Sequence, residues 1–152
     1  MKEIPSINEQ LCFPIYVISR QITTLYRPYL EKLGLTYPQY LVMLVLWETG
    51  TCCVKDIGER LWLDSGTLTP LLKRMEENGW ISRSRCADDE RIVLIHMTEK
   101  GINLKPLVSE LPCILKKELS DEDGRLDDLR NQLNDLLSFI SNKCKTKHNL
   151  IK

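Results

Sequence analysis

The fold is decided by residues 63–74, which read LDSGTLTPLLKR. Asp64 and Ser65 are both suited to cap a helix, because their side-chain oxygens can accept hydrogen bonds from the first turn. The helix that starts there is expected to run to about Asn78, which forms a stop signal with the following glycine. A short helix predicted over residues 54–61 precedes it, and two helices joined by a tight turn predict a helix-turn-helix.

A β-hairpin is predicted directly after this pair of helices. Residues 80–85 (WISRSR) and 91–98 (RIVLIHMT) favour strands, and the polar residues 86–90 between them favour a loop. Such a hairpin beside a helix-turn-helix is a wing. The expected fold is therefore mainly α (α+β), with a winged helix-turn-helix at residues 36–100.

An apolar segment before this module is expected to supply the core. Residues 36–50 read TYPQYLVMLVLWETG, with Thr36 as a helix N-cap, Pro38 in the first turn and Gly50 at the end. Thr98 is expected to cap a further helix after the wing.

Helices are also predicted on both flanks. Apolar residues three to five positions apart predict a first helix over roughly 8–32, which Pro28 should kink or interrupt and Gly34 should end. A leucine stripe predicts a C-terminal helix that starts at Ser120 and frays from Lys143. The expected plan is one domain, 1–152, with dimerisation helices at 8–35 and 106–143.

The composition excludes several classes of protein. With 43% hydrophobic and 28% charged residues, the chain is typical of a globular protein. It has no apolar run long enough for a membrane span, and its polar start lacks a signal core, so we expect a cytoplasmic protein. Six scattered cysteines, none in a CxxC pair, indicate free thiols.

The net charge of the chain is zero, so DNA binding would have to depend on where the charges lie. Residues 55–100 carry eight basic and nine acidic side chains. Short hydroxyls let a helix lie close in the major groove, basic residues reach phosphates or guanines, and a wing arginine can enter the minor groove. A protein-interaction module with a solvated basic face is the alternative. The candidate DNA-binding residues are Ser65, Thr67, Thr69, Lys73, Arg74, Arg83, Arg85 and Arg91.

Roughly residues 8–105 resemble the MarR family of transcription regulators, and within it the organic-hydroperoxide-sensing, OhrR-like branch. The quoted helix motif is intact, and the DxR motif of the wing reads Asp89-Glu90-Arg91, which adds Asp89 to the candidate DNA-binding residues. The resemblance implies a homodimer whose terminal helices form the dimer core and which binds a pseudo-palindromic DNA operator as a repressor. It does not extend over residues 113–152.

Cys12 lies near the predicted start of the first helix, in NEQLCFPIY. A helix N-terminus favours the reactive thiolate, and the apolar neighbours Leu11, Phe13 and Ile15 would favour an organic hydroperoxide over hydrogen peroxide. From chemistry alone, Cys12 could also be a small core residue. OhrR-like sensors carry their reactive cysteine in a similar context, so the resemblance implies that Cys12 is the sensing thiol.

The resemblance also implies that the hydroxyls of Tyr16, Tyr26 and Tyr37 hold the thiolate. Tyr16 is one helical turn from Cys12, but Tyr26 is fourteen residues along, about 21 Å on a straight helix. Tyr26 must then come from a partner chain, unless the helix breaks at Pro28. Core packing with a satisfied hydroxyl is the alternative role for these tyrosines.

An oxidised Cys12 would be a sulfenic acid, which needs a thiol to resolve it. Cys113 is the candidate resolving thiol, and an external low-molecular-weight thiol is the alternative. The other cysteines are expected to be bystanders: Cys52 and Cys53 in a turn, Cys86 on the wing and Cys144 beside the tail.

Three other functions compete with peroxide sensing. The strongest is a MarR-type repressor released by a small aromatic ligand at the dimer interface. A metal sensor is disfavoured because the two histidines and the cysteines show no ligand spacing. A redox enzyme is disfavoured because CxxC and glycine-rich phosphate loops are missing. We therefore expect no cofactor and no metal.

Overall fold

The computed structural model of the chain describes residues 4–119 and 123–149, with side chains as far as Lys143. It divides into two compact units, residues 1–111 and 112–152. In chain order the elements are η1 (Ile7–Glu9), α1 (Cys12–Glu31), α2 (Tyr37–Thr49), β1 (Thr51–Cys53), α3 (Val54–Leu61), α4 (Ser65–Glu77), β2 (Ile81–Arg85), β3 (Val93–Met97), α5 (Glu99–Val108), α6 (Leu111–Glu118) and α7 (Arg125–Asn149).

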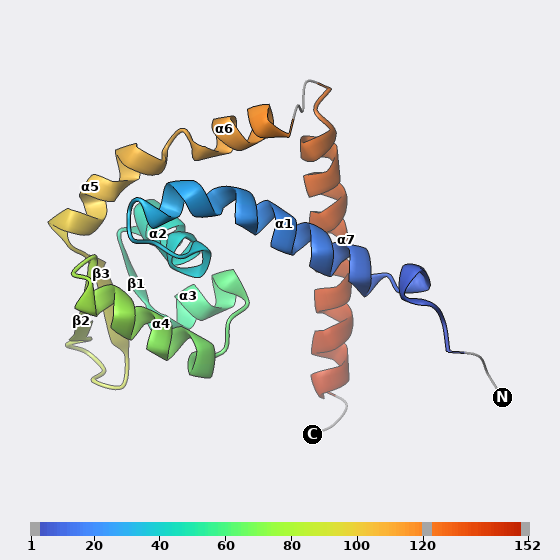
Figure 1. Cartoon of the computed structure of the whole chain (residues 1–152). Coiled ribbons are helices and arrows are strands. Elements are labelled where there is room, and N and C mark those ends of the chain that lie inside the picture. Colours follow the sequence, from blue (N-terminus) through green and yellow to red (C-terminus); the bar gives the residue numbers. More distant parts are fainter. Residues whose placement is uncertain (1–3, 120–122, 150–152) are drawn as a thin grey trace. The chain divides into compact units, whose positions relative to one another are not determined.

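The predicted fold class, mainly α with a winged helix-turn-helix, is confirmed. Helices α3 and α4 form the helix-turn-helix, and β2 and β3 form the antiparallel wing (Figure 1). A third strand was not predicted: Cys52 and Cys53 were expected in a turn, but they lie in β1 opposite Ile95 and Leu94 of β3. The sheet order is β1-β3-β2. Three residues give too short a pattern to reveal a strand whose partner lies more than 40 residues away.

The core of the first unit is built around α2. Val42, Met43 and Leu46 of this helix are fully buried. They are joined by an apolar stripe on α4, which repeats at the three- to four-residue spacing of one helix face, and by residues of α3 and the sheet. The buried partners are Ile57, Leu68, Leu72, Met75, Ile81 and Ile95.

Local capping signals fix the ends of these helices as predicted. The Thr36 N–H donates to Oε1 of Gln39 at 2.8 Å, and α2 ends at Gly50, whose φ of 74° suits glycine. Asp64 caps α4, and the Thr98 hydroxyl caps α5 by accepting the Gly101 N–H. These caps leave the helix-turn-helix and the wing with defined boundaries.

Helix α1 is unbroken from Cys12 to Glu31 with Pro28 inside it, so the expected interruption near residues 26–27 is wrong. Pro28 lies in the last turn and removes only the donor to the carbonyl of Thr24, which a long helix can tolerate. The helix ends at the turn around Gly34, as predicted, where φ is 73°.

In the second unit, α7 begins later than predicted. It starts at Arg125 after Gly124, whereas Ser120 lies outside the described residues. The Nζ of Lys116 contacts Oδ2 of Asp127 at 2.6 Å and joins α6 to α7. The expected fraying from Lys143 is also wrong, because α7 continues to Asn149. Among the described residues, no helix is long and apolar enough to cross a membrane.

Candidate functional site

The N-terminus of α4 is held by Asp64. Its Oδ1 accepts the backbone N–H of Thr67 at 2.8 Å, and its Oδ2 accepts the Thr67 hydroxyl at 3.2 Å. These hydrogen bonds lower the pKa of the Asp64 carboxyl, so it stays charged at neutral pH. Thr67 is therefore engaged in the cap, whereas Ser65 and Thr69 are exposed on the same helix.

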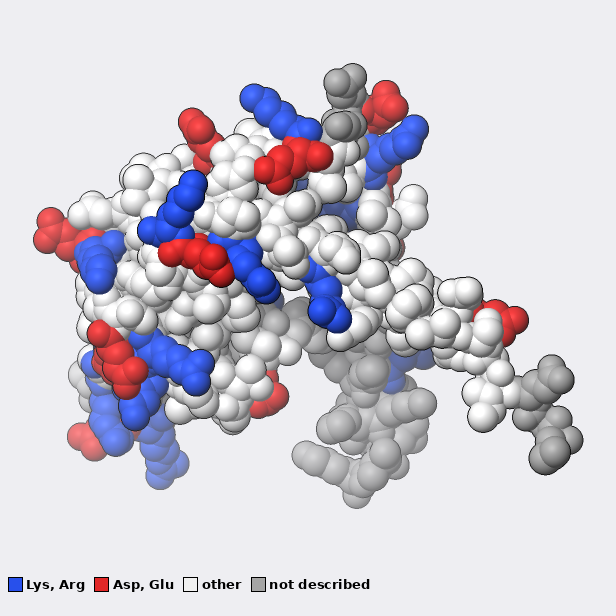
Figure 2. All heavy atoms as spheres, viewed as in Figure 1, with Lys and Arg blue, Asp and Glu red and all other residues white. Residues whose placement is uncertain are grey.

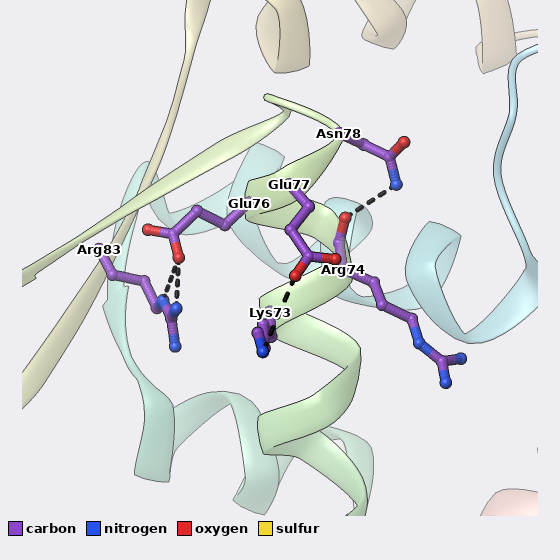
Figure 3. A network of polar contacts seen from close by, with 6 residues as sticks. All are labelled: Lys73, Arg74, Glu76, Glu77, Asn78 and Arg83. Atoms are coloured by element: carbon purple, nitrogen blue, oxygen red, sulfur yellow. Dashed lines mark hydrogen bonds and ion pairs between the residues drawn. The ribbon is translucent and has the colours of Figure 1, made fainter.

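Two basic residues on α4 differ in their surroundings. The Nζ of Lys73 lies 3.9 Å from Oε1 of Glu77, within a network at the end of the helix. Arg74 contributes only its backbone carbonyl to that network, through a 2.8 Å hydrogen bond from Asn78, and its guanidinium points away from it (Figure 3). The guanidinium of Arg74 is therefore not held by this network.

Arg83 is held against α4. Its Nε donates to Oε2 of Glu76 at 2.7 Å, and its Nη2 contacts the same oxygen (Figure 3). The hydrogen bonds from Arg83 lower the pKa of Glu76, so the pair is charged at neutral pH. Sequence reasoning placed Arg83 among the DNA contacts, and it could not detect this pairing between a helix and a strand.

The wing tip is shaped by two side chains of the predicted set. The Arg91 N–H donates to Oδ1 of Asp89 at 2.9 Å, and Nη1 of Arg85 donates to the carbonyl of Glu90 at 2.9 Å. Arg91 was expected in a strand but lies in a turn, because β3 starts only at Val93. Its side chain is exposed and makes no ion pair within the part of the chain that the structure describes.

Charge on this face is mixed. Figure 2 shows basic side chains gathered over the wing and α4, at the lower left, with acidic ones among them. This agrees with the near balance of charges counted over residues 55–100. Binding of a polyanion here depends on the few basic groups that have no acidic partner.

The side chain of His96 contacts both edge strands of the sheet, a role that the sequence analysis did not identify. It lies on the central strand β3, with Nδ1 3.1 Å from the Thr51 hydroxyl and Nε2 2.8 Å from the Ser84 hydroxyl. Both edge strands therefore contact one imidazole. Because β1 was not predicted, its contact with His96 could not be foreseen.

Cys12 is the first residue of α1, and its thiol is exposed. The apolar neighbours Leu11 and Ile15 are 66% and 40% exposed, so one chain alone does not enclose the thiol in an apolar site. Tyr16 is also exposed, and its hydroxyl accepts a 3.4 Å hydrogen bond from Nη1 of Arg20. This end of α1 is open to a further partner.

The other tyrosines form a cluster, which we call the tyrosine cluster, of Tyr26, Tyr37 and Tyr40. The ring centroids of Tyr26 lie 5.0 Å from Tyr37 and 5.9 Å from Tyr40. Burial, with a smaller effect of the two neighbouring phenols, raises the pKa of Tyr26 to about 12. Burial also raises the pKa of Tyr37 and of Tyr40, so all three hydroxyls remain protonated donors at neutral pH. Tyr40 resembled ordinary core in the sequence and was not predicted.

The continuous α1 separates this cluster from Cys12 within one chain. Tyr26 and Cys12 are fourteen residues apart on one helix, about 21 Å at its regular rise. The structure therefore brings Tyr26 and Tyr37 together, but it does not bring either to the Cys12 of the same chain. With α1 unbroken, a break at Pro28 no longer offers another route.

The remaining cysteines are dispersed. Cys113 is exposed on α6, whereas Cys144 lies outside the described side chains. Cys52 is buried, which raises the pKa of its thiol, and the Cys53 sulfur accepts the Asp56 N–H at 3.4 Å as the N-cap of α3. Among the described residues, no three of His, Cys, Asp and Glu lie together as metal ligands would.

Comparison with known proteins places this geometry among transcription regulators. Residues 24–107 match the family described as transcriptional regulator SarA/Rot. The organic hydroperoxide resistance transcriptional regulator of Bacillus subtilis (strain 168) is 49% identical over 138 residues, which cover 90% of this chain and 93% of that protein.

Two solved structures of the protein AbfR are also similar. Reduced AbfR bound to DNA has a TM-score of 0.76 at 36% identity, covering 88% of this chain and 94% of that one. Disulfide-formed AbfR has a TM-score of 0.65 at 36% identity, covering 87% and 92%.

Proposed function

This chain belongs to the MarR/SarA family of transcription regulators, in its OhrR-like branch, and from that premise we propose that it is a repressor that organic hydroperoxides release from DNA by oxidising Cys12. It is a DNA-binding regulator rather than an enzyme, as its relatives are. The specific contacts, the dimer and the sensing chemistry are the proposal. The relative captured with a disulfide supports thiol chemistry of this kind.

The proposal rests on the distance along α1 between the Cys12 thiol and the tyrosine hydroxyls that would donate hydrogen bonds to it. The hydroxyls of the tyrosine cluster are protonated donors, which suit a thiolate acceptor, yet Tyr26 lies about 21 Å along α1 from the Cys12 of its own chain. In a homodimer, the Cys12 of one chain would meet Tyr26 and Tyr37 of the partner. Exposed apolar residues at the start of α1 and on α7 supply surface for this association: the N-cap Leu11, then Ile15, Ile18, Leu133, Leu137 and Phe139.

On the DNA side, each chain would place α4 in the major groove and the wing in the neighbouring minor groove. Ser65, Thr69 and Arg74 are exposed on α4 and open to base edges, and Arg91 is the open wing arginine. Two-fold symmetry then requires a pseudo-palindromic operator with half-sites about 10 bp apart.

The proposed oxidation step is balanced by the hydroperoxide itself. The Cys12 thiolate attacks the terminal oxygen, the O–O bond breaks, an S–O bond forms, and the alcohol leaves with a proton. A second thiol, from Cys113 or a low-molecular-weight thiol, can then displace water to form a disulfide. Either product replaces the compact anion that the tyrosines of the partner hold.

The loss of these hydrogen bonds is large enough to drive release. A hundredfold loss of DNA affinity requires about 2.7 kcal/mol. Two charge-assisted hydrogen bonds contribute about 1.5–3 kcal/mol each. Because such a switch works only through differential stabilisation of two states, the tyrosines must bind thiolate better in the DNA-binding state.

The test uses a probe duplex enriched from a random-sequence library by the reduced wild-type protein. Cumene hydroperoxide should release this duplex from the wild type but not from Cys12→Ser, and mass spectrometry should find the modification on Cys12. The mass of the modified peptide distinguishes a disulfide with Cys113 from one with an external thiol. Release of Cys12→Ser at the wild-type rate would reject cysteine sensing and favour the small-aromatic-ligand alternative.

A further inference from the structure

The wing is anchored to α4 at its base by backbone hydrogen bonds. The Trp80 N–H donates to the carbonyl of Met75 at 3.1 Å, and the Gly79 N–H donates to that of Glu76 at 2.8 Å. At the same base, after the chain leaves β3, the Nζ of Lys100 donates to the carbonyl of Asn78 at 2.8 Å. These contacts fix where the wing begins, but they lie at the end opposite to Arg91.

Further along the hairpin, Arg83 and Glu76 make a polar side-chain contact between wing and helix. Arg83 is the third residue of β2, and Glu76 lies in the last turn of α4. Two guanidinium nitrogens converge on one carboxylate oxygen, and both side chains are about one-third exposed, at 34% and 35%. The planar fork of arginine makes such a contact directional, which a lysine could not reproduce.

We propose that the Glu76–Arg83 pair is a positioning device that sets the angle of the wing against α4, and that Arg83 does not contact DNA. Its role is to let Arg91 and the α4 side chains reach one duplex together. The inference rests on the DNA contacts proposed above. It reassigns Arg83 from the contacts that the sequence suggested.

Replacing the Glu76 carboxylate distinguishes the two possible roles of Arg83, because they predict changes in DNA affinity of opposite sign. If Arg83 contacted phosphate, Glu76→Gln would free the arginine and remove a negative charge near DNA, so binding would tighten. If the pair positions the wing, Glu76→Gln should weaken binding of the probe duplex about fivefold, the upper range for an exposed ion pair. The direction of the change therefore decides between them.

Glu77→Gln is the matched control. It removes the same charge from the next residue of α4, where the carboxylate lies 3.9 Å from Lys73 and acts on Arg83 only through its charge, as a smaller contribution than Glu76. We expect this variant to bind the duplex at least as tightly as the wild type. Equal affinities of Glu76→Gln and Glu77→Gln would overturn the proposal.

Arg83 variants supply a second readout. Arg83→Lys keeps the charge but loses the fork, so it should weaken binding about as much as Glu76→Gln. Arg83→Gln should do the same without changing the salt dependence of binding, whereas loss of a phosphate contact lowers the slope by about 0.9 per contact. The double variant with Glu76→Gln and Arg83→Gln should bind the duplex no more weakly than Arg83→Gln alone. Normal binding by Arg83→Lys, or a reduced salt slope for Arg83→Gln, would overturn the proposal.

Two further measurements distinguish loss of wing positioning from unfolding and from loss of the Arg91 contact. Circular dichroism melting of each variant checks that it folds, since loss of an exposed pair should shift the melting temperature little. Arg91→Ala in the same titration tests the wing contact separately. If that variant binds normally while Glu76→Gln binds weakly, the pair does not act by positioning Arg91, and the proposal is overturned.

Discussion

The indole Nε1 of Trp47 donates a 3.1 Å hydrogen bond to the carbonyl of Gly101, and so joins the end of α2 to the first turn of α5. Gly101 is buried, and a Cβ at this position would overlap the carbonyl oxygen of Trp80. Because the opposing atom belongs to the backbone, it cannot move aside as a side chain can. The contact between α5 and the base of the wing therefore requires glycine.

Gly101→Ala should lower the free energy of unfolding by about 1–3 kcal/mol, the usual cost of overpacking. Trp47→Phe keeps an aromatic ring and removes the donor, so it should cost about 1 kcal/mol. Urea unfolding of the reduced protein measures both. A Gly101→Ala variant as stable as the wild type would show that α5 is free to shift.

Arg74→Ala and Arg91→Ala should both weaken binding of the probe duplex. An arginine that reads a base contributes about 1–3 kcal/mol of discrimination, so Arg74→Ala should also relax sequence preference. Arg91→Ala should weaken binding through the minor groove. Gel-shift titration with the selected duplex and a scrambled one measures both effects. Unchanged affinity of Arg91→Ala would remove the wing from DNA recognition.

Stability should fall at alkaline pH because of the tyrosine cluster. The pKa of Tyr26 is about 12 in the folded chain and about 10 when unfolded, so only the unfolded state releases the proton between these values. Stability present below pH 10 is therefore lost as the pH rises toward 12. Tyr26→Phe should show a shallower fall in melting temperature over this window. Tyr16→Phe, which removes an exposed hydroxyl, should follow the wild-type curve.

Local signals in the sequence were sufficient for most of the fold. Asp64, Thr98 and Gly50 act within a few residues of the helix ends that they define, so their roles are visible in the sequence. The strand β1 depends on pairing with β3, more than 40 residues away, and no local pattern encodes it. For the same reason the contacts of His96 on both edge strands were not predicted.

The candidate site was predicted less completely than the fold. From residue types alone, Arg83 was predicted to contact DNA. Its partner Glu76 lies on another element, so only the fold reveals the pairing. Tyr40 lies in a strongly apolar helix and gave no signal beyond core packing, yet it contacts both Tyr26 and Tyr37. The helix rule did predict that Cys12 cannot reach Tyr26 of its own chain along an unbroken helix, and the structure shows that α1 is unbroken.

That separation leads to a test with mixed dimers. If Cys12 of one chain uses Tyr26 of the other, a dimer of Cys12→Ser with Tyr26→Phe keeps one complete site, made by the intact Cys12 and the intact Tyr26 of opposite chains. Its Cys12 should react with cumene hydroperoxide at the wild-type rate. A second dimer combines a wild-type chain with a chain that carries both Cys12→Ser and Tyr26→Phe. It keeps Cys12 in one chain, but the opposite chain lacks the Tyr26 hydroxyl, so this Cys12 should react slowly.

The two mixed dimers have the same composition, and only the distribution of the substitutions over the chains differs. Any effect on folding or on overall charge is therefore shared, and the ratio of their oxidation rates reports which chain supplies the tyrosine. Tandem affinity tags isolate each mixed dimer, and stopped-flow mixing with mass spectrometry of the Cys12 peptide gives the rates. If the chains instead formed the site within one subunit, the order of the two rates would reverse. Equal rates would show that Tyr26 does not assist the thiolate.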